Sequence, residues 1–138
     1  MKAKHYLSQY QRLTTIIKNK QIEKEQWFEA ATRITSSYDS VRVQTSGGQG
    51  RMAEAAVEYA DLGREIDRQI VEAEKAKRNI IHTIEQLQIE EYDVLHKHYV
   101  QGLTLMEVAD LKNKSYSLIT TVHGRGLKKV QAILDEKE

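Results

Sequence analysis

The sequence predicts an all-α protein, from its lack of proline, its helix-favouring composition and the spacing of its apolar residues. The 138 residues include no proline, where a usual frequency of about 5% would give roughly seven. Because proline interrupts helices, its absence beside abundant Glu, Lys, Gln, Ala and Ile favours long helices. Apolar side chains also recur three and four residues apart, which is the period of an α-helix.

Composition excludes several classes of protein. The chain is 40% hydrophobic and 30% charged, which is too charged for a membrane protein and too apolar for a disordered chain. No apolar run reaches the ~18 residues of a membrane span, and the first residues lack the apolar core of a signal peptide. The absence of cysteine excludes disulfides and thiolate sites and fits a reducing cytoplasm.

Residues 1–87 are predicted to form a long antiparallel coiled-coil hairpin. A first helix covers about residues 3–34, and Ser, Thr, Asp and Gly interrupt the helical period over residues 35–50. In a second helix, about residues 51–87, one set of mostly apolar residues recurs every seven positions and a companion set lies three residues earlier. The first set is Tyr59, Ile66, Ala73, Ile80 and Leu87, and the second is Ala56, Gly63, Ile70, Lys77 and Ile84. Because such narrow seams leave little core, we also expect a homodimer or higher oligomer formed through this hairpin.

Residues 88–138 are predicted to form a second domain with the outline of a helix-turn-helix. A helix over residues 88–100 ends at Gly102, and a shorter helix follows over about residues 105–111. Thr104 with Glu107 forms a capping box that opens this shorter helix.

The turn that follows has the residues that its backbone requires. Asn113 can adopt the left-handed conformation, and Ser115 is suited to cap the N-terminus of a final helix. Leu118 or Ile119 and Val122 begin the apolar face of that helix.

Charge is distributed unevenly, although the net charge is only +1. Residues 1–20 hold five basic residues and no acidic one, and so does the stretch from Leu111 to Leu134. The basic residues of the second stretch are Lys112, Lys114, Arg125, Lys128 and Lys129. An acid-free basic stretch at one end of a neutral chain predicts a polyanion-binding surface there.

The same region resembles a known family. The stretch E-x-x-x-L-x-x-x-Y-V-x-G-x-T-L-x-E-V-A, followed by S-x-S-x-I-x-x-V-x-G-R-G-L-K-K-V, is similar to region four of bacterial primary sigma factors, and the match runs without a gap from Thr104 to Val130. The whole chain looks closer still to small proteins of phages and prophages of Gram-positive bacteria, which join an N-terminal helical hairpin to a sigma-region-four-like C-terminus. That family is related to late-gene regulators of such phages. The resemblance implies a sequence-specific transcriptional regulator in the bacterial cytoplasm that binds double-stranded DNA and acts with host RNA polymerase.

A recognition helix reads base edges with its N-terminal residues while flanking groups hold phosphates. Hydroxyl groups for base edges are expected from Ser115, Ser117, Thr120 and Thr121, and apolar contacts to a thymine methyl from Tyr116 or Leu118. Phosphate contacts are expected from Lys112, Lys114, Arg125, Lys128 and Lys129. Sigma recognition helices begin with several Arg, Lys and Glu residues, which this helix lacks, so no promoter element can be transferred. Gly124 and Gly126 stand where alanine is usual, and glycine costs about 1 kcal/mol in a helix interior.

Alternative interpretations remain at this stage. The C-terminal domain could bind polymerase or a sigma partner without touching DNA, or the chain could be a DNA-packaging accessory similar to small terminase subunits. Lys128 and Lys129 could simply favour a helix C-terminus, Tyr116 could be a packing residue, and His123 could be a surface residue or a phosphate contact. His96 and His98 point to different helix faces without a third ligand, so we expect no metal site. No catalytic constellation has a plausible setting, so we expect no enzyme and no cofactor.

Overall fold

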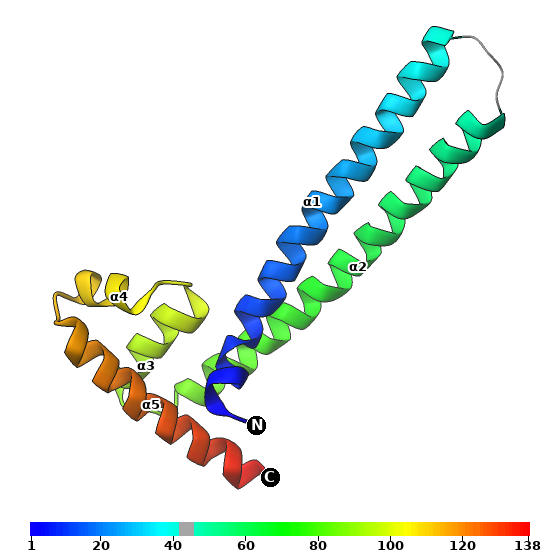
Figure 1. Cartoon of the computed structure of the whole chain (residues 1–138). Coiled ribbons are helices and arrows are strands. Elements are labelled where there is room, and N and C mark those ends of the chain that lie inside the picture. Colours follow the sequence, from blue (N-terminus) through cyan, green and yellow to red (C-terminus); the bar gives the residue numbers. More distant parts are fainter. Residues whose placement is uncertain (42–45) are drawn as a thin grey trace. The chain divides into compact units, whose positions relative to one another are not determined.

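Helices make up the secondary structure that the computed structural model describes (Figure 1). The backbone is described for residues 1–41 and 46–138, and the side chains for residues 1–33 and 50–138. No strand occurs in these ranges, which confirms the all-α prediction for them. None of the described helices has the length and apolarity that crossing a membrane requires.

The chain divides into two compact units. The first unit comprises Met1–Leu13 with Glu72–Glu138, and the second unit comprises Thr14–Val71. The domain boundary expected at residue 87 therefore falls inside the first unit, because residues from both long helices pack with the C-terminal helices there.

The two long helices extend further than the sequence predicts. Helix α1 spans Ala3–Val41 and helix α2 spans Ser46–Ile84, so both occupy parts of the loop expected over residues 35–50. The central residues of that loop, 42–45, lie outside the described residues. Serine and glycine each destabilise a helix interior by only about 1 kcal/mol or less, so they do not force a helix to end. At its other end α2 stops three residues early, where Leu87 donates a backbone hydrogen bond to Ile84 in a tight turn.

In the second unit, α1 and α2 run in opposite directions. The Lys20 ammonium lies 3.0 Å from the Glu65 carboxylate, and the rings of Phe28 and Tyr59 are 5.9 Å apart. Later residues of α1 thus meet earlier residues of α2. Ile66 is buried there with only 5% of its surface exposed.

The first unit has two apolar clusters. One joins the start of α1 to the end of α2 and to α5, with Leu7, Ile80, Ile84, Leu95 and Val130 fully buried. The other lies among the C-terminal helices and contains Val94, Val108, Ala109, Ile119 and Val122. These clusters fix the start of α1 and the C-terminal helices in one body.

The helix expected over residues 88–100 changes its hydrogen-bond pattern midway. Helix α3 covers Ile89–Leu95 and continues as the π-helical segment η1, His96–Val100, where Gln101 donates to the carbonyl of His96. Gly102 follows with φ at +81° and ends the segment as predicted. This positive φ is a conformation that glycine adopts without steric cost.

Local sequence signals around the last two helices are confirmed. Helix α4, Leu105–Lys112, begins with the predicted capping box of Thr104 and Glu107. Asn113 adopts the left-handed conformation with φ at 54°. The Ser115 hydroxyl oxygen then accepts the amide hydrogen of Leu118 at the start of α5, Tyr116–Lys137.

Candidate nucleic-acid interface

The first residues of α5 present a mixed polar and apolar surface. Tyr116 and Leu118 are 50% and 43% exposed, and Ser115 and Ser117 are exposed as well. The next inward residue, Ile119, is 1% exposed and anchors this end of the helix in the core. The exposure of Tyr116 argues against the packing role considered for it.

The two threonines are held by their own helix. Thr120 and Thr121 donate their hydroxyl hydrogens to the carbonyl oxygen of Ser117, at 2.8 and 2.9 Å. Each hydroxyl oxygen keeps its lone pairs for an incoming donor. Thr121 is exposed and Thr120 half-buried, so Thr121 is the more accessible of the pair.

Four of the predicted site residues share one face of α5. At about 100° per residue, Ser117, Thr121, Arg125 and Lys128 fall within roughly 80° of arc. All four are exposed, whereas Ile119 and Gly126 on the opposite side are buried. The hydroxyl groups lie in the N-terminal half of this face and the cations in its C-terminal half.

Three of the five predicted phosphate ligands are free of acidic partners. Lys114, Arg125 and Lys128 are exposed, and within the described part of the chain none of them forms an ion pair. These three cations are available to a polyanion without first breaking an internal contact.

Lys112 is engaged elsewhere. Its ammonium bonds the Asp93 carboxylate and lies 3.6 Å from that of Glu90, and only 14% of its side chain is exposed. Burial alone would raise the pKa of Asp93, but hydrogen bonds from Lys112 and Lys97 outweigh it and lower that pKa. The hydrogen bond to Asp93 also raises the pKa of Lys112. Lys112 therefore ties α4 to α3, and its expected role as a phosphate ligand does not fit this position.

Lys129 is also paired. Its ammonium lies 2.9 Å from a carboxylate oxygen of Glu91, whose side chain is only 3% exposed. Glu91 caps the start of α3, where it also accepts the backbone amide hydrogen of Gln88. The predicted phosphate role of Lys129 thus competes with neutralising a buried carboxylate.

His123 is half-buried rather than a free surface residue, in contrast to one of the two expectations for it. Its ring stacks on Tyr99, and a hydrogen bond of 2.8 Å joins its Nε2 to the Tyr99 hydroxyl. Burial, followed by the charges of His98 and Lys4, lowers the pKa of His123 to about 4. Burial also raises the pKa of Tyr99 to about 12. Both groups are neutral near pH 7 and join η1 to α5.

Basic residues from the N-terminal end of the chain, which the sequence did not predict as phosphate contacts, lie beside α5. Lys2 and Lys4 lie with Lys128 around a surface hollow of about 590 Å³. The acid-free basic stretch of residues 1–20 was the available signal. Periodicity could not place that stretch beside α5, because the contact spans more than 120 residues of chain.

No group of three or more His, Asp or Glu side chains that could hold a metal ion occurs among the described residues. His96 bonds Gln101 through Nδ1, and His98 bonds the carbonyl of Leu103. Both imidazoles therefore have structural partners.

Comparison with protein-family models, curated proteins and solved structures found no match to this chain.

Proposed function

We propose that this protein is a sequence-specific regulator of transcription that binds double-stranded DNA through α5. Helices α4 and α5 would act as a helix-turn-helix, with α5 in the major groove. The observation that carries the proposal is one exposed face of α5, on which Ser117 and Thr121 precede Arg125 and Lys128.

The dimensions of α5 suit this role. Residues 115–121 span about 9 Å along a helix axis, which fits within a major groove about 12 Å wide. Arg125 lies about 15 Å from Ser115 along the same axis. The hydroxyl groups would therefore lie opposite base edges, and Arg125 and Lys128 opposite the phosphates at the groove edge.

The free cations set the expected strength of binding. Each phosphate that a cation neutralises contributes about 0.9 to the slope of log K against log salt. Lys114, Arg125 and Lys128 together would give a slope of about 3 per protomer, rather than the 4 to 5 of all five basic residues. A slope this small indicates weak binding by one protomer, so specific occupancy would require a dimer or help from host RNA polymerase.

The long helices would supply the dimer contact, as a coiled-coil hairpin. In the second unit Phe28, Tyr59 and Ile70 are 56%, 37% and 41% exposed and line one hollow of about 490 Å³. Tyr59 and Ile70 belong to the seven-residue repeat of α2, so this repeat is only partly covered within the unit. A second copy would bury the remainder.

Phage or prophage origin rests on the resemblance of the whole chain to small phage and prophage proteins, and action with host RNA polymerase rests on the resemblance of residues 104–130 to sigma region four. The capping box of α4 and the left-handed Asn113 are the features of that stretch that the structure supports. Asn113 lies in the turn between α4 and α5, whose geometry a helix-turn-helix requires, and the capping box fixes the start of α4.

Fluorescence anisotropy with a labelled duplex of mixed sequence, over about 50 to 200 mM salt, tests DNA binding. We expect binding that weakens with salt and a slope that falls by about 2 in the variant Arg125→Gln/Lys128→Gln. The matched control is Lys75→Gln/Arg78→Gln, which removes the same charge from exposed residues of α2. Absence of duplex binding by the native chain at low salt, or equal slopes for the two variants, would refute the proposal.

Sequence preference has its own test. After selection of a preferred duplex, Ser117→Ala and Thr121→Ala should reduce the ratio of preferred to random binding by about tenfold, since a lost base contact costs about 1–3 kcal/mol. An unchanged ratio would show that this face of α5 does not read bases.

One observation favours a second candidate, a module that binds polymerase or a sigma partner without DNA. Leu111, Tyr116 and Leu118 are 43–60% exposed around the turn between α4 and α5, and Met106 near the start of α4 is 56% exposed. Such side chains are typical of protein contacts. Polymerase capture that survives nuclease treatment, together with absent duplex binding, would favour this candidate over the first.

A further inference from the structure

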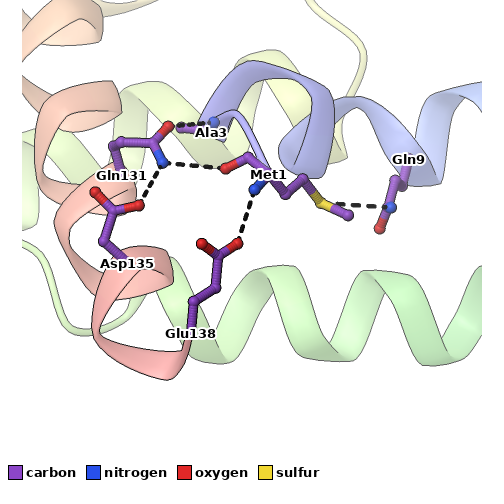
Figure 2. A network of polar contacts seen from close by, with 6 residues as sticks. All are labelled: Met1, Ala3, Gln9, Gln131, Asp135 and Glu138. Atoms are coloured by element: carbon purple, nitrogen blue, oxygen red, sulfur yellow. Dashed lines mark hydrogen bonds and ion pairs between the residues drawn. The ribbon is translucent and has the colours of Figure 1, made fainter.

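Hydrogen bonds to one glutamine, together with apolar packing, join the start of α1 to α5. Gln131 accepts the amide hydrogen of Ala3 at 2.8 Å and donates to the carbonyl oxygen of Met1 at 3.0 Å, as Figure 2 shows. Its amide group also donates to Asp135 at 3.0 Å. Ala3 is 5% exposed and belongs to the same apolar cluster as Val130, so packing supports these hydrogen bonds.

This contact brings two more cations to α5. Lys2 and Lys4 flank Ala3 in the sequence, and both line the hollow of about 590 Å³ that Lys128 borders. Both are exposed, and within the described residues neither forms an ion pair. The Lys4 charge also contributes, after burial and the His98 charge, to the lowered pKa of His123 on α5.

Two carboxylates at this contact, those of Asp135 and Glu138, have other partners. Asp135 bonds Gln131 itself, and Glu138 lies 2.9 Å from the Met1 amine. Figure 2 shows both carboxylates engaged in these contacts. Neither carboxylate neutralises Lys2, Lys4 or Lys128.

We infer that Lys2 and Lys4 extend the cationic surface of α5 and contact DNA phosphates beyond the groove edge, with Gln131 as the residue that positions them. This inference rests on the proposed DNA binding. It adds two phosphate ligands to Lys114, Arg125 and Lys128, so the slope expected per protomer rises from about 3 to between 4 and 5. The surface recognises the backbone of duplex DNA and carries no base specificity.

The test compares full-length variants in the same anisotropy assay. Lys2→Gln/Lys4→Gln should lower the salt slope by about 2 and weaken preferred and random duplexes by the same factor. Lys75→Gln/Arg78→Gln again controls for net charge. Thermal melting followed by circular dichroism verifies that each variant is folded.

The positioning role has a separate readout. Gln131→Ala keeps both lysines but removes their anchor, so we expect a smaller slope than native. When it is combined with Lys2→Gln/Lys4→Gln, the slope should fall no further, because both changes remove the same contacts. Additive losses would refute the role of Gln131.

The outcomes separate this inference from the proposed function. If Arg125→Gln/Lys128→Gln lowers the slope but Lys2→Gln/Lys4→Gln behaves like the control, α5 binds DNA and the extension is refuted. If the native chain shows no salt-dependent duplex binding, the proposed function and the extension are both refuted.

Discussion

Two glycines of α5, two residues apart, should respond to the same substitution with opposite changes in stability. A Cβ atom added at Gly124 would meet no atom within 4 Å, apart from its neighbours and the backbone of its own helix. A Cβ atom at Gly126 would lie 3.0 Å from Cδ1 and 3.3 Å from Cγ of Leu95. Leu95 is fully buried, so it cannot move aside without displacing the rest of its cluster.

The magnitudes follow from these two environments. Gly124→Ala gains the helix propensity of alanine, about 1 kcal/mol, with nothing to oppose it. Gly126→Ala gains the same propensity, but crowding in a packed core costs about 1–3 kcal/mol. We therefore expect Gly124→Ala to stabilise the protein by about 1 kcal/mol and Gly126→Ala to destabilise it by up to about 2 kcal/mol.

Urea denaturation followed by circular dichroism measures both free energies of unfolding. The two variants have the same composition, so their difference, about 1–3 kcal/mol, isolates the contact with Leu95. Equal stabilities would show that α3 and α5 do not approach as closely as described. In a Leu95→Ala background, which lacks the crowding atoms, Gly126→Ala should cost less than it does in the native chain if that contact is the cause.

Further predictions concern acidity, the buried carboxylate and association. Because the pKa of His123 is about 4 in the folded protein and about 6.5 in an unfolded chain, the unfolded state binds the proton more readily, so stability should fall as pH drops from 6.5 towards 4. His123→Gln should reduce this fall by about 1–2 kcal/mol, measured by urea denaturation at pH 7 and 4.5, and an unchanged pH dependence would contradict the assignment. Lys129→Ala leaves Glu91 buried without its cation and should cost about 1–2 kcal/mol, whereas Lys129→Arg should cost less; equal losses would show that charge is not what matters. Phe28→Ser/Ile70→Ser removes exposed side chains of the second unit, so light scattering should show a dimer becoming a monomer without loss of helix, and a native monomer would refute the dimer.

Predictions from sequence succeeded where neighbours in the chain decide the structure. The capping box of Thr104, the left-handed Asn113 and the cap by Ser115 each depend on residues within four positions. Helix ends were predicted less well. No single residue near positions 34 and 51 has a strong enough preference to stop a helix.

Contacts between distant residues explain what the sequence did not predict. Lys112 meets Asp93 across 19 residues, and Lys129 meets Glu91 across 38. A count of charges along the chain cannot reveal such pairs, so it assigned both lysines to the candidate interface. The partial exposure of Ile70 has a similar origin, because a seven-residue repeat does not specify how many helices cover it.

The ion pair between Lys129 and Glu91 of α3 makes the distribution of charge around α5 uneven. Along the chain, residues 111–134 lack acidic residues, but α3 neutralises one flank of the helix with Glu91. The start of α1 adds positive charge on another flank, beside Lys128. The electrostatic potential around α5 is therefore asymmetric, so an approaching polyanion would be steered toward one side of the helix before any contact forms.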